Sequence, residues 1–97
     1  MTLQLQAQKL EASLDIRDRK YNFKTYKKCF IGSDAIKVMI SLNLASNENE
    51  AMKLGNKLIQ SNIIQHVTKK HAFKNEKLFY RYTDQYHQTD SYKSTLD

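Results

Sequence analysis

The feature that most constrains the fold is the near absence of residues that force the backbone to turn. The chain of 97 residues has no proline and only two glycines, Gly32 and Gly55. Proline and glycine are the strongest local breakers of regular structure, so their scarcity favours long helices with few interruptions. We therefore expect helices to dominate, with Gly32 and Gly55 at the sites where the chain is forced to turn.

The size and composition predict one compact unit. With 97 residues, of which 40% are hydrophobic, the chain can close one modest core and has no material for a second domain. Cys29 is the only cysteine and cannot form an intramolecular disulfide, and no apolar run has the length of a membrane span or a signal sequence. We expect a monomer in the reducing environment of the cytoplasm.

Two segments have the apolar spacing of amphipathic helices. The first is residues 2–15, where Thr2 is placed to cap the first turn. The second follows Ser33 and has apolar residues at Ala35, Ile36, Met39 and Ile40. Ser33 is its expected cap, and this helix should end near residues 42–43.

A third helix has the clearest start signal of the chain. Capping residues and two acids open the segment at residues 46–50, and Asn62 is placed to end it in the left-handed conformation that Asn tolerates. Its apolar stripe is Ala51, Leu54, Gly55, Leu58 and Ile59.

Two hairpins complete the predicted elements. Charged and aromatic residues alternate over residues 16–26, which suits a hairpin that turns near residues 20–22. Residues 64–68 and 78–82 are rich in β-branched or aromatic residues, and the polar loop 69–77 joins them. They predict a second hairpin with a long tip.

The order of these elements defines the expected fold class. It is an α+β, winged-helix-like arrangement: a three-helix core with a β-hairpin arm between helices 1 and 2 and a C-terminal β-hairpin. We expect residues 1–82 to form this domain. Residues 83–97 lack an apolar period and are predicted to be a disordered polar tail or linker.

Three motifs in this order resemble the DEP family. They are IRDRKYNFKTYKKCFIGSDAI at residues 16–36, EAMKLGNKLIQSNIIQHV at 50–67 and HAFKNEKLFYRY at 71–82. The resemblance covers residues 14–82, and the first motif is most similar to DEP domains of guanine-nucleotide exchange factors, including the cyclic-AMP-regulated exchange factors for Rap. The chain departs from the common pattern in its second helix, where Lys37 and Val38 replace an acid and an aromatic residue.

This resemblance implies a non-catalytic module of intracellular signalling that brings proteins to membranes. The expected partners are anionic phospholipids and a membrane-associated signalling protein. The expected localisation is cytoplasmic, with peripheral recruitment to a membrane.

The residues add a candidate surface to this expectation. The chain carries 16 Lys and Arg against 10 Asp and Glu, a net charge of +6. Residues 17–28 alone hold six of the positive charges against Asp18, interleaved with aromatic rings that suit a headgroup boundary. The expected contacts in this arm are Arg17, Arg19, Lys20, Tyr21, Lys24, Lys27 and Lys28.

The second hairpin adds Lys69, Lys70, Lys74, Lys77 and Arg81, against Glu76, and its tip is expected to join the same candidate surface. The expected contacts among them are Lys69, Lys70 and Lys74. Each basic residue near an anionic leaflet contributes about 1 kcal/mol, so five contacts give at most about 5 kcal/mol and a dissociation constant in the upper micromolar range. A second contact with a partner or another domain is therefore expected. We expect the arm, with its higher charge density, to contribute more than the second hairpin.

Nucleic-acid binding is the alternative that a winged-helix fold suggests. The third helix argues against it, because Glu48 and Glu50 cancel the charges of Lys53 and Lys57 and occupy the turn that would face phosphates.

Catalysis and metal binding have no support in the pattern. The histidines, His66, His71 and His87, have no second ligand at metal-binding spacing, and Cys29 has no identifiable base, so it is interpreted as a small buried thiol. No phosphate-cradling loop or nucleophile motif is present. We predict no cofactor, no metal and no enzyme activity.

Overall fold

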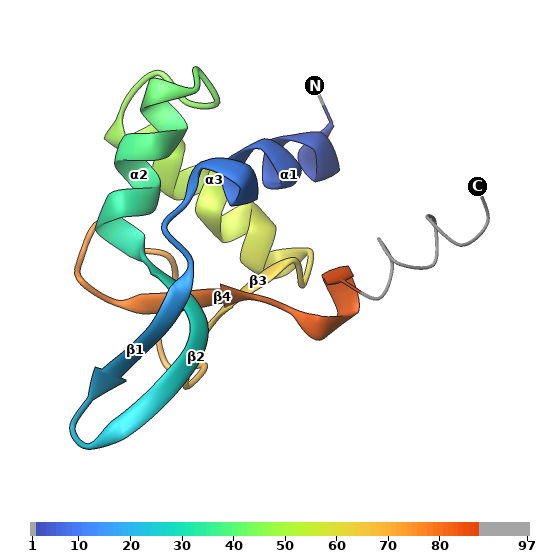
Figure 1. Cartoon of the computed structure of the whole chain (residues 1–97). Coiled ribbons are helices and arrows are strands. Elements are labelled where there is room, and N and C mark those ends of the chain that lie inside the picture. Colours follow the sequence, from blue (N-terminus) through green and yellow to red (C-terminus); the bar gives the residue numbers. More distant parts are fainter. Residues whose placement is uncertain (1, 88–97) are drawn as a thin grey trace.

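The computed structural model describes residues 2–87 and confirms the predicted class and order of elements (Figure 1). The elements are α1 (Leu3–Ser13), β1 (Arg17–Tyr21), β2 (Lys24–Ile31), α2 (Gly32–Ser41), α3 (Glu48–Gln60), β3 (Ile64–His66) and β4 (Phe79–Tyr82). The three helices pack together on one side of a four-stranded antiparallel sheet, and the β1–β2 arm projects away from them. None of the helices in the described part is long and apolar enough to cross a membrane.

Local capping explains where α1 and α3 begin. The Thr2 hydroxyl accepts a hydrogen bond from the Leu5 amide at 3.1 Å, as predicted. At α3, the Asn47 side chain accepts from the Glu50 amide and the Glu50 carboxylate accepts from the Ser46 amide, both at 2.9 Å. The pKa of Glu50 is lowered, and the backbone hydrogen bond from Ser46 is the largest cause.

The start of α2 differs from the prediction that Ser33 caps it. The cap position is Ile31, two residues earlier, so the helix begins at Gly32 and has no side-chain cap. Its first amides are satisfied by the backbone of the loop before β4: the Gly32 amide donates to the Leu78 carbonyl at 2.9 Å, and the Ser33 amide donates to the Glu76 carbonyl at 3.0 Å. A distant segment therefore replaces the local cap.

The glycines do not provide the turns, which corrects the expectation from composition. Neither glycine has a positive φ; among residues 2–87, that conformation falls on six others, including Asn22, Asn43 and Asn62. Asn tolerates the left-handed region, so this chain turns without glycine. Asn62 ends α3 with φ 59°, as predicted.

Gly55 is instead a packing position. It lies in the middle of α3, and a Cβ atom there would come within 2.1 Å of the Phe73 ring. Phe73 is buried, and its amide donates to the Asn56 side chain at 3.0 Å. The absent side chain lets the loop before β4 lie directly on α3.

The sheet has the order β1-β2-β4-β3, so β4 lies at its centre. The second hairpin forms as predicted, because β3 pairs antiparallel with β4. Its strands are shorter than expected, spanning Ile64–His66 and Phe79–Tyr82. Pairing of Phe30 with Tyr80 and of Ile31 with Phe79 joins the arm to this hairpin.

The core forms between the helices and the face of the sheet that carries Phe30 and Tyr80. Its largest fully buried side chains are Tyr80, Phe30, Leu10, Met39, Leu58, Ile64 and Cys29. Phe79 is half-buried on the opposite face of β4 from Tyr80, because successive strand residues point to opposite faces.

The segment after Tyr82 is partly packed on the domain. Thr83 and Tyr86 are buried, and the Thr83 hydroxyl donates to the Asn62 carbonyl at 2.6 Å. Nε2 of His87 lies 2.8 Å from Oε2 of Glu11 on α1. Residues 83–87 therefore differ from the predicted disordered tail, and the rest of that segment, residues 88–97, lies outside the described residues.

The packing of Gly55 against Phe73 leads to a stability prediction. In an exposed helix, changing Gly to Ala stabilises by about 1 kcal/mol. Here Gly55→Ala should instead lower the free energy of unfolding by about 1–3 kcal/mol, because the new methyl group overlaps a buried ring. Urea unfolding measures this, with Asn49→Ala, exposed on the same helix, as the control. A stabilised Gly55→Ala variant would contradict the packing.

Candidate membrane and partner interface

The pleat of the arm separates its side chains onto two faces. Arg19 lies opposite Tyr26, and Tyr21 lies opposite Lys24, so these four share the face turned toward β4. Tyr21 and Tyr26 confirm this direction, because both rings meet the Phe79 ring edge-on, at centroid distances of 6.5 and 6.1 Å.

The other face of the arm is basic and points away from the domain. Lys20 lies opposite Thr25, between the pairs of the inner face, and Lys27 continues the same alternation along β2. Both lysines are exposed. The predicted arm cations therefore do not form one cluster, but divide between an outer face and an inner face.

The arm turns at Asn22 and Phe23, slightly later than the predicted residues 20–22. Their φ values of 51° and 65° are the two positive angles that a type I′ turn requires. Phe23 is fully exposed, at 108%. A positive φ is a rare and strained conformation for a bulky residue. The tip of the arm therefore combines a strained backbone with an apolar ring exposed to solvent.

Arg19 is a structural residue and not a free cation, which corrects its predicted role. Its side chain is only 10% exposed. The guanidinium donates to the carbonyl of Cys29 in β2 and, at 3.1 Å, to the carbonyl of Asp15 ahead of β1. The charge of Arg19 is therefore used to join the base of the arm to the chain that leads into it.

Two other arm cations lie beside acids. Arg17 forms an exposed ion pair with Asp15 at 3.0 Å, a kind of pair that contributes little. Lys28 has φ 50° at a β-bulge, where the Asp18 carboxylate accepts from its amide at 3.0 Å. The Lys28 ammonium stays exposed beside this bulge.

The predicted lysines of the second hairpin also separate. Lys70 lines a groove between this hairpin and the arm, whereas Lys69 lines a smaller hollow beside α3. Lys74 belongs to the loop before β4 and packs beside the start of α2, where its carbonyl oxygen would be 2.8 Å from a Cβ atom added to Gly32. Of the three, only Lys70 therefore shares a cavity with the arm residues Tyr21 and Lys24.

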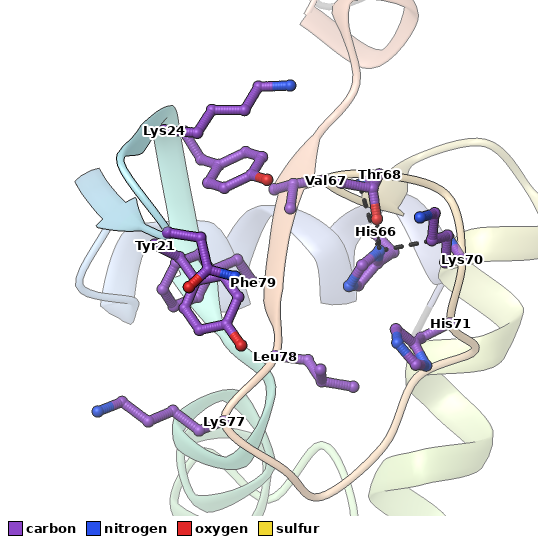
Figure 2. Close-up of a pocket in the computed structure, with 12 residues that line it drawn as sticks. Tyr21, Lys24, His66, Val67, Thr68, Lys70, His71, Lys77, Leu78 and Phe79 are labelled. Atoms are coloured by element: carbon purple, nitrogen blue, oxygen red, sulfur yellow. Dashed lines mark hydrogen bonds between the residues drawn. The ribbon is translucent and has the colours of Figure 1, made fainter.

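Figure 2 shows this groove, which has a volume of about 420 Å³. One wall is the inner face of the arm, the floor is Phe79 with Leu78, and the other wall is the loop after β3. None of the residues that line it is Asp or Glu. The groove therefore combines aromatic surface with unopposed positive charge.

His66 on the loop wall is buried and accepts hydrogen bonds from two backbone amides. It is 7% exposed, and its Nδ1 accepts from the Thr68 amide at 3.2 Å and the Lys70 amide at 3.4 Å. Burial, followed by the neighbouring His71 and Lys70, lowers the pKa of His66. An acceptor role for Nδ1 leaves the hydrogen on Nε2.

Sequence reasoning missed two parts of this site. Phe23 was recognised as an arm aromatic but was not among the expected contacts, and His66 was not linked to the arm. An Asn at the first of two adjacent turn positions is a signal for the type I′ turn that exposes Phe23. The groove itself depends on the pairing of β2 with β4, which has no local signal.

The described residues contain no group of three or more His, Cys, Asp or Glu side chains placed to hold a metal ion. In α3, Glu48 accepts a hydrogen bond from Asn75 and Glu50 caps the helix, so both acids occupy its first turn. An acidic helix start repels phosphates, which argues against the nucleic-acid alternative.

The fold and the projecting arm define an α+β domain of the winged-helix-like class, and comparison with known proteins identifies the family. The sequence profile described as "Domain found in Dishevelled, Egl-10, and Pleckstrin (DEP)" matches residues 13–82. The chain therefore belongs to the DEP family.

Several named proteins contain a similar segment. The phosphatidylinositol 3,4,5-trisphosphate-dependent Rac exchanger 2 protein of Homo sapiens is 39% identical over 67 residues, which are 69% of this chain and 4% of that protein. The lysosomal cholesterol signaling protein of Mus musculus is 36% identical over 90 residues, 80% of this chain and 10% of that protein. The chain thus spans a small part of these relatives. The narrower resemblance to Rap exchange factors stays a prediction.

Solved DEP domains share the fold at low sequence identity. The DEP domain of mouse pleckstrin2 aligns with a TM-score of 0.74 and 23% identity, covering 87% of this chain and 82% of that one. The DEP domain of human pleckstrin aligns with a TM-score of 0.71 and 18% identity, covering 87% of this chain and 77% of that one.

The contacts of Arg19 predict that neighbouring arm residues differ in their effect on stability. Arg19→Ala should lower the free energy of unfolding by about 1–3 kcal/mol, because it leaves the Cys29 carbonyl without this charged donor. Lys20→Ala, on the exposed outer face, should change it by less than about 0.5 kcal/mol. Equal effects in urea unfolding would contradict the structural role of Arg19.

The environment of His66 predicts a pH-dependent stability. Because the pKa of the folded-state ring lies below the ordinary 6.5, the unfolded chain binds the proton more readily, and stability should fall as the pH drops from 7.5 to 5.5. This window stays above the range in which Glu50, whose pKa is lowered from 4.5, loses its contribution. His66→Asn should reduce the slope in urea unfolding; an unchanged slope would contradict the assignment.

Proposed function

We propose that this DEP domain is a non-catalytic recruiting module that docks on anionic phospholipid surfaces through the tip and outer face of the β1–β2 arm. The observation that carries the proposal is Phe23, an apolar ring held fully exposed at the most distant point of the arm. A strained turn that presents a ring to solvent has no stabilising role in the isolated domain. Strain of this kind often accompanies function.

Charge and shape around Phe23 suit a membrane surface. Lys20 and Lys27 lie exposed on the outer face of the arm. Burying an aromatic ring contributes about 1.5–3 kcal/mol, and each lysine near an anionic leaflet adds about 1 kcal/mol. Ring and lysines together support reversible binding, stronger than the cations alone provide.

The names of the relatives are consistent with this proposal. One is a phosphatidylinositol 3,4,5-trisphosphate-dependent exchanger. The Saccharomyces cerevisiae protein IML1, 29% identical over 102 residues that are 97% of this chain and 6% of that protein, is named vacuolar membrane-associated. We propose that this chain likewise brings the protein that contains it to a membrane, where it acts in G-protein-linked signalling beside a membrane-associated partner.

A single substitution separates the stability of the arm from its proposed function. Phe23→Gly creates an Asn-Gly pair, the favoured sequence for a type I′ turn, and should raise the free energy of unfolding by about 0.4–1 kcal/mol. The same change should weaken binding to vesicles of phosphatidylcholine with phosphatidylserine about tenfold or more, because it removes the inserted ring. Co-sedimentation measures the binding.

Charge variants supply the controls for this experiment. Lys20→Glu with Lys27→Glu should abolish vesicle binding, and added salt should weaken binding of the unaltered chain because it screens exposed charges. The matched pair Lys69→Glu with Lys74→Glu should weaken it less. Equal binding to neutral vesicles, or a larger loss from the second pair, would contradict the proposal.

A further inference from the structure

The groove between the arm and the second hairpin is separate from the proposed membrane contact. Its aromatic surface comes from both hairpins: Tyr21 and Tyr26 from the arm and Phe79 from β4. Tyr21 is exposed at 62% and Phe79 is only half-buried, so these rings present apolar area to solvent. A volume of about 420 Å³ is large enough for a bulky side chain and its neighbours.

Positive charge surrounds this aromatic surface from three segments of the chain. Lys24 comes from β2, Lys70 from the loop after β3, and Lys77 from the stretch that leads into β4. Figure 2 shows Lys24 and Lys77 near opposite ends of the groove and Lys70 on the far wall. Because no acid lines the groove, a cationic ligand finds no partner there, whereas an anionic ligand has three lysines around it.

We infer that this groove binds a short acidic segment of a partner protein, with a large apolar side chain on the rings of Tyr21, Tyr26 and Phe79 and its flanking carboxylates at the lysines. Consecutive residues of an extended peptide are about 3.3–3.6 Å apart, so one short segment brings both chemistries into the groove. Aromatic anchors with a charged rim are the usual anatomy of such contacts.

A protein segment fits the groove better than a lipid leaflet does. A leaflet is a broad surface, and the arm projects from the body to meet it (Figure 1), whereas the groove lies between the arm and the second hairpin. A phosphate headgroup satisfies the lysines but leaves the three rings without an apolar partner. An acidic peptide with one large apolar residue satisfies both.

The inference names the partner chemistry of the recruiting module and rests on the proposed function in that sense, yet it uses different residues. Phe23, Lys20 and Lys27 serve the membrane, whereas Lys70, Lys77 and Tyr21 serve the groove. Two weak contacts held in one small domain reinforce each other through high effective concentration. The domain would then be retained most strongly where an anionic membrane carries an acidic partner segment.

The test is a selection from a random seven-residue peptide library displayed on phage, with the whole chain immobilised. We expect enrichment of peptides in which a large apolar residue is flanked by acids. A synthetic copy of the most enriched peptide should bind in fluorescence anisotropy and shift the ring resonances of His66. Lys70→Glu with Lys77→Glu should weaken that binding about tenfold or more.

Matched variants separate the groove from the arm and from folding. Tyr21→Ser should weaken peptide binding, whereas Tyr21→Phe should preserve it, because the contact needs only the aromatic ring. Lys20→Glu with Lys27→Glu should leave peptide binding nearly unchanged while abolishing vesicle binding. Lys70→Glu with Lys77→Glu should weaken peptide binding and leave vesicle binding nearly unchanged. Peptide binding without vesicle binding would therefore sink the proposed membrane contact and leave the groove standing.

Three results would overturn the inference. One is a selection that yields no enrichment or yields peptides without acids. Another is a selected peptide whose binding survives the Lys70→Glu and Lys77→Glu pair in a folded protein. The third is vesicle binding that depends on Lys70 and Lys77 as strongly as on the outer face, which would assign the groove to a lipid.

Discussion

The packing of Tyr80 at the centre of the sheet is the interaction on which the other parts of the structure depend. The ring is fully buried and stacks on Phe30 of β2, with centroids 6.1 Å apart. Its hydroxyl donates to the Ala72 carbonyl at 2.6 Å and accepts from the Lys74 amide at 3.1 Å. Burial is the largest cause of its raised pKa. One side chain therefore joins the arm, the core and the long loop.

This central contact also determines the surfaces available for binding. Because β4 pairs with β2 along Phe30 and Ile31, the base of the arm is fixed to the body while its far end extends beyond the sheet. The neighbour of Tyr80 on the strand, Phe79, then points to the opposite face and meets the arm rings. The buried and the exposed aromatic clusters are consequences of the same strand pairing. The groove and the projecting tip follow from it.

The sequence and the structure agree where a feature depends on neighbouring residues. The cap at Thr2, the acidic start of α3 and the left-handed Asn62 are each explained by residues within one turn of them. The order of elements was also predictable, because helical and strand periodicities are local patterns. The predictions failed where a distant segment intervened: the Leu78 and Glu76 carbonyls replaced the expected cap at Ser33.

By itself, the sequence determined the number, type and order of the elements, the basic character of the arm and membership of the DEP family. Only the tertiary structure decided which basic and aromatic side chains share a surface. Arg19 is consumed in joining the arm to its base, whereas Phe23 is left free at the tip. The physical reason is that Arg19 bonds to Cys29 on the other strand of the arm and that the groove depends on the pairing of Phe30 with Tyr80, residues far apart in the chain. The local sequence around each residue does not show which distant strand it pairs with.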